Sequence, residues 1–365
     1  MKITRYACHP YTAPLNRPIH IGEHEANKRQ GHIIELFTKD GAVGRGDVAP
    51  LGGLNPEDLS LACEQTAMVG YSLLGSTVSS AIPQFEGAFE KLFSEFDLYP
   101  SVRFGVESAI LNLLAAVEDM PLSKLLNPDA RDTVTISGLI TSQGDEAVQR
   151  AGFLRDRGFR AVKLKVGGDP KQAAAVARAV RETVGADVTL RLDANCAWSF
   201  ADALLFTHAI EDLAIDYLEE PLSKPMDTLQ LIRKTDVPLA LDETLLKLYP
   251  DVLPSWKGVK AIVLKPTVLG GIERAMHFAR EAREIGVTPV VSAAFESGVG
   301  IGTLAHLAAA LNGDEDVPAG LDTYGWLDHD VLREPLPAHA PTWDLADVDR
   351  ALQSFDVQET VDTRG

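Results

Sequence analysis

The chain contains little cysteine. Its 365 residues include three cysteines, Cys8, Cys63 and Cys196, which are too few and too scattered for a disulfide framework or a zinc site. The chain must therefore be stabilised by a buried core, and a hydrophobic content of 45% is enough to form a sizeable one. The scarcity of cysteine predicts a globular protein of a reducing compartment.

Basic residues are also scarce relative to acidic ones. Lysine and arginine number 34 against 52 aspartates and glutamates, which gives a formal charge of −18. Nucleic acids and anionic membranes bind proteins through basic faces. We therefore expect a small-molecule substrate and neither a nucleic-acid nor a membrane partner.

Long apolar stretches are missing as well. No run of about 18 apolar residues is available to span a bilayer. The first residues, MKITRYACHPYTAPL, lack the apolar core of a signal peptide. Together with the low cysteine content, these absences predict a cytoplasmic location.

The hydrophobic pattern divides the chain into three parts. Residues 1–130 place β-rich segments near 2–15 and 31–49 around a polar loop, IGEHEANKRQ, before three helical patterns, which is typical of an α+β domain. Residues 131–325 alternate short apolar runs with amphipathic helices, and 326–365 form a C-terminal segment. From Asp344 onward the pattern is acidic and weak, which indicates partial disorder.

The alternation in the second part predicts parallel strands joined by helices. Seven apolar runs act as strand candidates: TVTISGLI, AVKLKVG, VTLRLDAN, IDYLEEP, VPLALDE, KAIVLKP and TPVVSAAFE. A closed βα barrel and an open doubly wound sheet both accommodate them. The absence of a GxGxxG or P-loop motif and the position of the charged residues favour the barrel.

Charged side chains occur where successive apolar runs end. They are Lys165, Asp193, Glu219, Asp242, Lys265 and Glu296. The spacing between neighbours is about one βα unit, so in a barrel these groups collect at the C-terminal rim, where βα-barrel active sites lie. Each acid alone could be a helix N-cap or a solvated turn residue, but their succession at adjacent strand ends favours a single site.

Three of the four carboxylates in this series end adjacent strands and would repel one another without a cation between them. Asp193, Glu219 and Asp242 form an all-oxygen set, which favours Mg²⁺, with Mn²⁺ as a substitute, over Zn²⁺. The sequence thus predicts a magnesium site at the rim.

Lysines beside such a site indicate proton chemistry. Lys163 and Lys165 lie two residues apart in a strand and therefore share a face. A lysine near positive charge can have its pKa lowered from about 10.4 towards about 7 to 8, where it acts as a base. We expect Lys163 to tune Lys165 and Lys165 to remove a proton α to a carboxylate, giving an enediolate that a divalent cation stabilises.

Short motifs around these residues resemble the enolase superfamily, in its muconate-cycloisomerase-like branch, and within it the o-succinylbenzoate synthase family. The motifs are KLK at 163–165, LDAN at 192–195, LEEP at 218–221, LDE at 241–243 and LKP at 264–266, supported by GRGDVAPLGGLNPE, SVRFGVESAILNLL, FESGVGIGTLAHLAAAL and GLDTYGWL. The resemblance covers nearly the whole chain. It implies a modified (β/α)7β TIM-type barrel with an N-terminal α+β capping domain, to which the C-terminal segment returns.

The resemblance also implies roles for single residues. Asp193, Glu219 and Asp242 correspond to the magnesium ligands. Lys165 corresponds to the base that takes the α-proton of 2-succinyl-6-hydroxy-2,4-cyclohexadiene-1-carboxylate and returns it to the departing hydroxyl. Lys265, across the ring, would stabilise the enediolate.

Further positions match the parts of the family that bind substrate. Arg191 and Asn195 flank Asp193. Ser292 and Gly320 correspond to the end that receives the succinyl group. Glu296 is also expected to bind substrate. The loop at 21–30 and the turn at 49–53 correspond to the lid. The chain departs from the family pattern at Asp47, where glutamate is usual, and at Ala293 and Ala294, where serines are common.

Three other functions remain open. Lysines on both sides of one α-carbon would also serve an N-succinylamino acid racemase. Another epimerase or cycloisomerase of the superfamily is less favoured, because Leu321-Asp322-Thr323-Tyr324 holds one acid where dipeptide epimerases have two and because GLDTYGWL argues against muconate cycloisomerisation. A non-catalytic barrel that only binds would be expected to have lost at least one of the five central groups.

Overall fold

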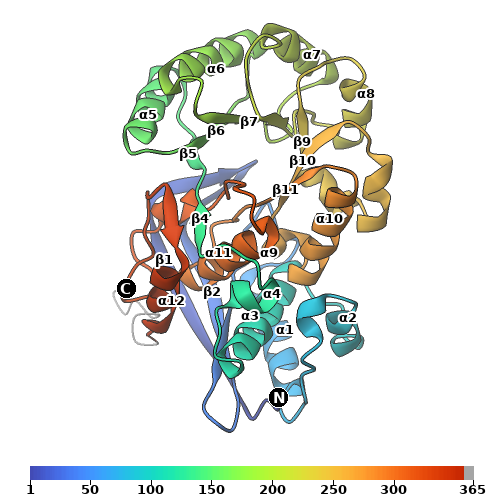
Figure 1. The fold of residues 1–365 in the computed structure, drawn as a ribbon, viewed down its shortest axis with the longest axis vertical. Helices are drawn as coiled ribbons and strands as arrows, with labels where there is room; N and C mark the ends of the chain where they lie inside the picture. The colour runs from blue at the N-terminus through green and yellow to red at the C-terminus, as the bar shows by residue number, and fades with distance from the viewer. Residues whose placement is uncertain (357–365) are drawn as a thin grey trace.

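Seven parallel strands form the central sheet of the computed structural model, which describes residues 1–356. Neighbouring strands are hydrogen-bonded in chain order, and the sheet curls into a barrel wall (Figure 1). The strands are β5 (Gly138–Ile140), β6 (Ala161–Lys165), β7 (Thr189–Asp193), β8 (Tyr217–Glu219), β9 (Leu239–Leu241), β10 (Val259–Leu264) and β11 (Thr288–Val291). The predicted βα barrel is thereby confirmed.

The two ends of this sheet are joined by a short segment at 319–320. Gly320 pairs in parallel with Ser292 just beyond β11, and Ala319 pairs in parallel with Ile136 just before β5. Backbone bonds support both junctions, with the N–H of Gly320 donating to Val291 at 2.9 Å and that of Ser137 donating to Ala319 at 2.8 Å. This segment occupies the place of the eighth strand.

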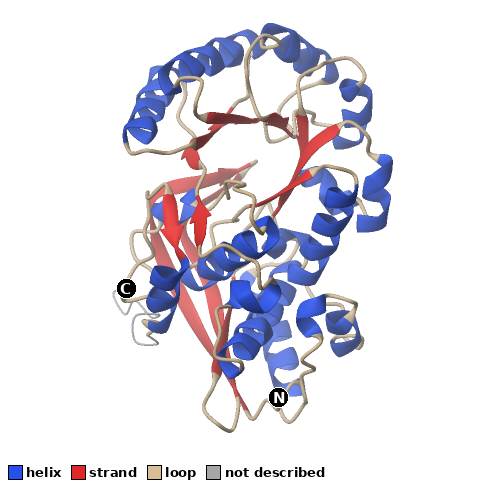
Figure 2. Ribbon diagram, viewed as in Figure 1, coloured by secondary structure: helices blue, strands red, loops and turns tan. Residues whose placement is uncertain are grey.

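Helices cover the outside of the curled sheet (Figure 2). They follow the amphipathic segments of the sequence and begin after caps such as Asp169 and Ser199, whose side chains accept backbone N–H bonds. The helices are α5 (Gly144–Asp156), α6 (Pro170–Val184), α7 (Phe200–Ala209), α8 (Thr228–Ile232), α9 (Pro266–Leu269), α10 (Ile272–Glu284) and α11 (Gly298–Asn312). Short 3-10 turns are η2 (Pro225–Asp227), η3 (Glu243–Lys247), η4 (Pro250–Ser255) and η5 (Asp322–Trp326).

An antiparallel three-stranded sheet and several helices precede the barrel. The sheet contains β1 (Arg5–Ile21), β2 (His24–Phe37) and β3 (Val43–Val48), and the helical elements are α1 (Leu59–Ser72), η1 (Ile82–Gln84), α2 (Ala88–Leu92), α3 (Pro100–Val117) and α4 (Leu122–Leu126). Strand β3 packs so closely on α3 that a side chain at Gly46 would collide with the backbone of Gly105. Helix α3 has the length and hydropathy of a membrane span, but 72% of it is buried inside the fold, so its apolar surface serves the core.

The sequence predicted a loop at 21–30, but most of this polar segment is β-strand. Strands β1 and β2 run through it and leave only a tight turn at Gly22 and Glu23. The error has a physical cause: many residues of this hairpin extension are exposed, so the alternation that identifies a strand is missing. The lid-like segment is therefore a hairpin tip.

The C-terminal part is more ordered than its acidic sequence indicated. Strand β12 (Thr342–Asp344) pairs antiparallel with β4 (Thr133–Thr135) and is followed by α12 (Leu345–Gln353), in which Leu345, Val348 and Ala351 are buried. The predicted disorder is wrong for 344–356, and residues 357–365 lie outside the described range. The domain limits at 130/131 and 325/326 remain predictions.

Two buried polar residues connect the N-terminal sheet to the barrel. Asp47 accepts hydrogen bonds from the backbone and hydroxyl of Ser297, both at 2.8 Å, at the start of α11. Arg29 donates to the carbonyls of Ala49, Pro50 and Phe295 at 2.7, 3.1 and 2.9 Å. These contacts fix the hairpin over the C-terminal ends of the barrel strands.

Candidate active site

A cavity of about 540 Å³ lies between the barrel rim and the hairpin, within the range of small-molecule sites. The barrel contributes lysines and polar residues from β6, β7, β10 and the segments that follow the strands. The hairpin contributes the residues from Arg17 to Gly22. The cavity is therefore closed by residues distant in sequence.

The parallel register brings the strand-end charges together. Lys165 on β6 pairs in register with Asp193 on β7, and Asp193 with Glu219 on β8. The Lys165 ammonium lies 2.6 Å from Asp193 Oδ2, and the Lys163 ammonium lies 2.8 Å from the same oxygen and 2.7 Å from Glu219 Oε1. The two lysines that the sequence placed on one face thus share one carboxylate.

The other half of the ring contains Asp242 and Lys265. They follow β9 and β10 and form an ion pair. Asp242 is held from behind by the buried Glu220, whose Oε2 accepts the N–H groups of Asp242 and Thr244 at 2.8 and 2.9 Å. The sequence pattern did not single out Glu220, and this positioning role was missed.

Burial and charge control ionisation in the ring. Burial disfavours the charged form of Asp193, but Lys163 and Lys165 outweigh this effect and hold the pKa of Asp193 well below its usual range. For Lys163, burial is likewise outweighed by Asp193 and Glu219, so its pKa is well above the usual value. Lys163 is therefore a permanent positive charge beside Lys165.

Glu219 is a buried carboxylate with one oxygen unpartnered, as expected for a residue that binds a cation. Burial and the neighbouring Asp193 raise the pKa of Glu219 well above its usual range, and its Oε2 is buried with no hydrogen-bond partner. Within residues 1–356 no three acidic or histidine groups are arranged around a common point as ion ligands; lysines neutralise the acids instead. The chemistry of the donor set nevertheless fits a hard divalent cation.

Arg191 and Asn195 flank the ring as expected, but in different ways. Arg191 is 3% exposed and donates to Asp216 at 2.9 Å and to the carbonyl of Pro318 at 2.7 Å, so it supports the barrel interior. Asn195 accepts a hydrogen bond from the Lys165 ammonium through Oδ1 at 2.6 Å. Both line the cavity.

Ser292 and Gly320 lie where the barrel closes, and both line the cavity beside Ala293 and Ala294. The Ser292 hydroxyl donates to the carbonyl of Gly320 at 3.3 Å. A side chain at position 320 would meet that hydroxyl at 2.5 Å, so glycine keeps this part of the cavity open.

Glu296 does not join the ring. It is 1% exposed, accepts bonds from Thr267 at 2.5 Å and from the N–H of Ala294 at 2.7 Å, and is absent from the cavity wall. The chain reverses at Phe295, whose φ is 64°, and carries Glu296 behind the rim. We therefore withdraw the expectation that it contacts substrate.

The predicted lid segments at 21–30 and 49–53 contribute Ile21, Gly22 and Gly53 to the hairpin side of the cavity, but the part around Arg17 was not predicted. The Arg17 guanidinium lies 3.7 Å from the centroid of the Trp326 ring, and Trp326 packs against Phe295 with ring centroids 5.1 Å apart. Ile19 and Leu51 belong to the same apolar cluster. Trp326 stands in the GLDTYGWL motif, but nothing near Arg17 in the sequence indicated a site.

Asp322, the one acid in the segment where dipeptide epimerases have two, already has partners. Its Oδ2 accepts the N–H of Leu139 at 2.9 Å and lies 3.5 Å from Arg150, and its Oδ1 lies 3.5 Å from His339. An ammonium group of a ligand would have to compete with the Arg150 guanidinium for this carboxylate.

Two family models match the chain. "MenC, N-terminal domain" matches residues 3–113, and "Enolase C-terminal domain-like" matches residues 146–347. Together they cover the hairpin sheet and the barrel from α5 onward, and with them most of the residues that line the cavity.

Curated relatives agree with these matches. The chain is 31% identical over 322 residues to an o-succinylbenzoate synthase of Vibrio cholerae, covering 86% of this chain and 88% of that one. It is 28% identical to the o-succinylbenzoate synthase of Pasteurella multocida, covering 95% and 96%. It is also 32% identical to Protein PHYLLO, chloroplastic, of Arabidopsis thaliana, of which it spans 22%.

Solved structures show the same fold. A dipeptide epimerase of Enterococcus faecalis, complexed with Mg and the dipeptide L-Leu-L-Tyr, superimposes with a TM-score of 0.84 at 24% identity, covering 94% of this chain and 97% of that one. A muconate lactonizing enzyme of Pseudomonas fluorescens gives a TM-score of 0.82 at 22% identity, covering 94% of both. The family models and the relatives show that the chain belongs to the o-succinylbenzoate synthase family of the enolase superfamily.

Proposed function

We propose that the chain catalyses the o-succinylbenzoate synthase reaction, the syn-dehydration of 2-succinyl-6-hydroxy-2,4-cyclohexadiene-1-carboxylate to 2-succinylbenzoate in menaquinone biosynthesis. The observation that carries this proposal is the ring in which Lys163, Lys165 and Lys265 line one cavity and contact three buried carboxylates, Asp193, Glu219 and Asp242. Family membership supports the choice of reaction.

Proton transfer is assigned to Lys165. Its neutral amine takes the proton α to the substrate carboxylate, and the resulting ammonium returns that proton to the departing hydroxyl, which leaves as water while the ring becomes aromatic. Asn195 and Asp193 hold the Lys165 nitrogen on the side of the cavity where this transfer occurs. One group thus acts as base and then as acid on the same face.

Negative charge that develops on the substrate carboxylate needs stabilisation. Asp193, Glu219 and Asp242 are the proposed ligands of Mg²⁺, with Mn²⁺ as a substitute, and the bound cation would supply positive charge to the enediolate oxygens. Lys265 adds a fixed positive charge, because Asp242 and Glu243 outweigh the effect of burial and raise its pKa above the usual value. Its position in the cavity suits a contact with the face of the substrate ring.

The test is the conversion of freshly prepared 2-succinyl-6-hydroxy-2,4-cyclohexadiene-1-carboxylate, followed by ultraviolet absorbance with Mg²⁺ and with a chelator. Rapid, chelator-sensitive loss of the diene is the expected result. Absence of turnover by folded, metal-loaded protein would rule out the proposed reaction. We retain the cytoplasm as the proposed location, which fractionation of the source cells would test.

N-succinylamino acid racemisation is the second candidate. Lys165 and Lys265 both line the cavity from strands β6 and β10, and lysines on two sides of an α-carbon can remove and return a proton on opposite faces. A solved N-succinyl Arg/Lys racemase of Bacillus cereus shares the fold, with a TM-score of 0.82 at 20% identity. Exchange of the α-proton of N-succinylamino acids in D₂O would detect this activity.

A further inference from the structure

Arg17 differs from the other basic residues that line the cavity. Lys163, Lys165, Lys265 and Arg191 each lie within ion-pair distance of an aspartate or glutamate. Among the described residues, no carboxylate lies within ion-pair distance of Arg17 and no hydrogen bond of its guanidinium is present. Its side chain is also solvent-exposed, so its N–H groups are available to a ligand.

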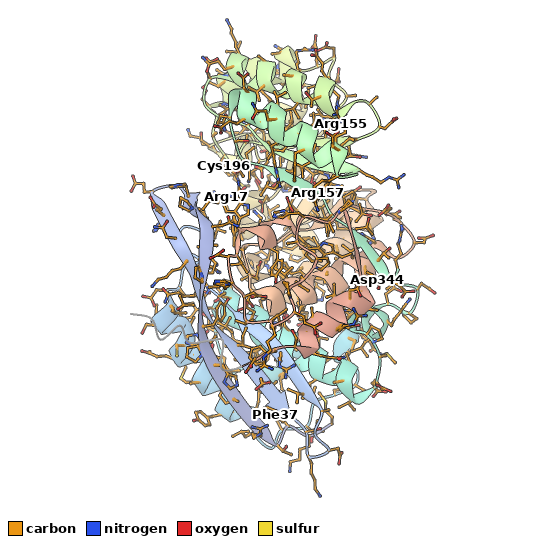
Figure 3. The ribbon with its side chains drawn as sticks, turned by 90° about the vertical axis from the view of Figure 1, so that its left-hand side faces the viewer. Arg17, Phe37, Arg155, Arg157, Cys196 and Asp344 are labelled. Atoms are coloured by element: carbon orange, nitrogen blue, oxygen red, sulfur yellow. The ribbon has the colours of Figure 1, made fainter. Side chains whose placement is uncertain are left out.

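The position of Arg17 is nevertheless fixed by its surroundings. Its guanidinium stacks on Trp326 at 3.7 Å, which leaves the N–H groups at the edge of the plane free to donate. Next to it, the Asn16 side chain donates to the carbonyl of Gly325 at 2.8 Å, and Leu15 pairs with Leu327. Figure 3 shows Arg17 where the hairpin meets the barrel.

The local charge suits an anionic ligand. Asp322, an acid of the cavity wall close to Trp326 in the sequence, forms an ion pair with Arg150 at 3.5 Å. Partial burial and the positive charge of Arg150 lower the pKa of Arg17 from its usual value, and the negative charge of Asp322 only partly offsets them. A carboxylate placed there would gain a planar, two-pronged partner.

We propose that Arg17 is a specificity-determining residue that binds the terminal carboxylate of the substrate's succinyl chain. This inference rests on the proposed function, whose substrate carries two carboxylates. The ring carboxylate faces the barrel lysines, and the second lies at the end of a flexible chain. Arg17 on the opposite wall of the cavity meets that second charge and thereby rejects ligands with a neutral or cationic tail.

The test compares two stable ligands by calorimetry. 2-Succinylbenzoate carries the tail carboxylate, and 2-butanoylbenzoate carries a methyl group in its place. We expect Arg17→Gln to weaken binding of 2-succinylbenzoate by about 10- to 100-fold, because a charge-assisted hydrogen bond is lost, and to leave 2-butanoylbenzoate unaffected. Arg17→Lys should restore part of the preference, and in turnover Arg17→Gln should raise KM far more than it lowers kcat.

Arg5→Gln is the matched control. Arg5 stacks on Phe37 at 3.4 Å in the same sheet but lies outside the cavity wall, and Figure 3 shows Phe37 at the end of the sheet opposite Arg17. This control variant should bind both ligands as the wild type does.

The outcomes separate the two proposals. If Arg17→Gln weakens both ligands equally or neither of them, or if the wild type does not prefer the succinyl ligand, the role of Arg17 is refuted even when the dehydration proceeds. An Arg17-dependent preference without turnover would refute the dehydration and keep the carboxylate site.

Discussion

The two walls of the cavity hold their positive charges in different ways. On the barrel wall, Lys163, Lys165 and Lys265 contact the carboxylates of neighbouring strands. On the hairpin wall, Arg17 rests on an aromatic ring with no carboxylate within ion-pair distance among the described residues. The barrel charges are thus arranged for chemistry inside a balanced network, whereas the hairpin charge is available to recognise a ligand.

This difference predicts that substitutions on the barrel wall affect kcat and that those on the hairpin wall affect KM. A group that acts only in the transition state lowers kcat when removed, and a group that binds substrate and transition state equally raises KM. The Arg17→Gln kinetics test the hairpin wall, and the following experiments test the barrel wall and one buried charge outside the cavity, beginning with the largest expected effect.

Replacing Lys165 with methionine should lower kcat by about 10³- to 10⁴-fold, because the general acid–base group is lost. Steady-state kinetics at saturating Mg²⁺ would measure the effect, and α-proton exchange in D₂O should disappear with it. Lys171→Met, at an exposed position of α6, is the control and should behave as wild type. A loss below about tenfold in Lys165→Met would assign proton transfer to another group.

Removing the metal should lower activity by about 10³-fold, since a cation contributes several kcal/mol of charge stabilisation. Dialysis against a chelator followed by titration with Mg²⁺ should abolish and then restore the rate. Glu219→Gln should shift the Mg²⁺ titration to higher concentration, because one proposed ligand charge is lost. Full activity in the chelator would contradict the assignment of the carboxylates.

Glu107 on α3 tests a buried charge outside the cavity. It accepts a bond from Arg103 at 2.7 Å and one from the N–H of Glu273 at 2.9 Å, and burial raises its pKa from 4.5 to about 7. The folded state therefore holds the proton more tightly than the unfolded state, so the stabilising contribution is present below pH 4.5 and is lost as pH rises through about 7.

Relative to Glu107→Gln, the wild-type free energy of unfolding should therefore fall by up to about 3 kcal/mol across that interval. Urea unfolding of both proteins at several pH values would measure the difference. A constant difference between the two proteins would contradict the raised pKa. kcat at fixed pH should change little, because Glu107 lies outside the cavity wall.

Glu220→Gln should have the smallest effect of this series, raising the Mg²⁺ concentration for half-maximal activity by about 10-fold. Glu220 contacts the backbone of Asp242 and positions it, and outer partners of metal ligands typically contribute to this degree. Glu182→Gln, at an exposed position of α6, is the control. If kcat falls with no change in the Mg²⁺ titration, Glu220 acts on something other than the proposed ligand.

The barrel wall could be predicted from the sequence because each strand and its terminal charge lie in one short segment. Each apolar run that ends in Lys165, Asp193 or Glu219 identifies a strand and its terminal charge together, and parallel register then aligns the charges. Glu296 was misplaced for a related reason: it stands several residues beyond its strand, where the path of the chain is no longer set by the strand.

The resemblance indicated a lid over the site, but the contacts of the hairpin wall could not be predicted because they are not local. The position of Arg17 depends on stacking with Trp326, and Asn16 donates to a carbonyl 309 residues away in the sequence. The hairpin extension is exposed in large part, so it lacks the apolar alternation that reveals strands. The positioning role of Glu220 was hidden for the same reason, since its partners, the N–H groups of Asp242 and Thr244, leave no mark in a sequence.

The pairing of the hairpin with the segment around Trp326 has a consequence for the order of folding. Synthesis delivers the hairpin first, then the strand-end ring through Lys265, and Trp326 only 61 residues later (326−265). Domains tend to fold as the chain emerges, so the ring can form on the ribosome before the surface that selects its ligand. A nascent chain stalled between these points would carry the catalytic groups and Arg17 but would still lack the Trp326 ring on which Arg17 stacks.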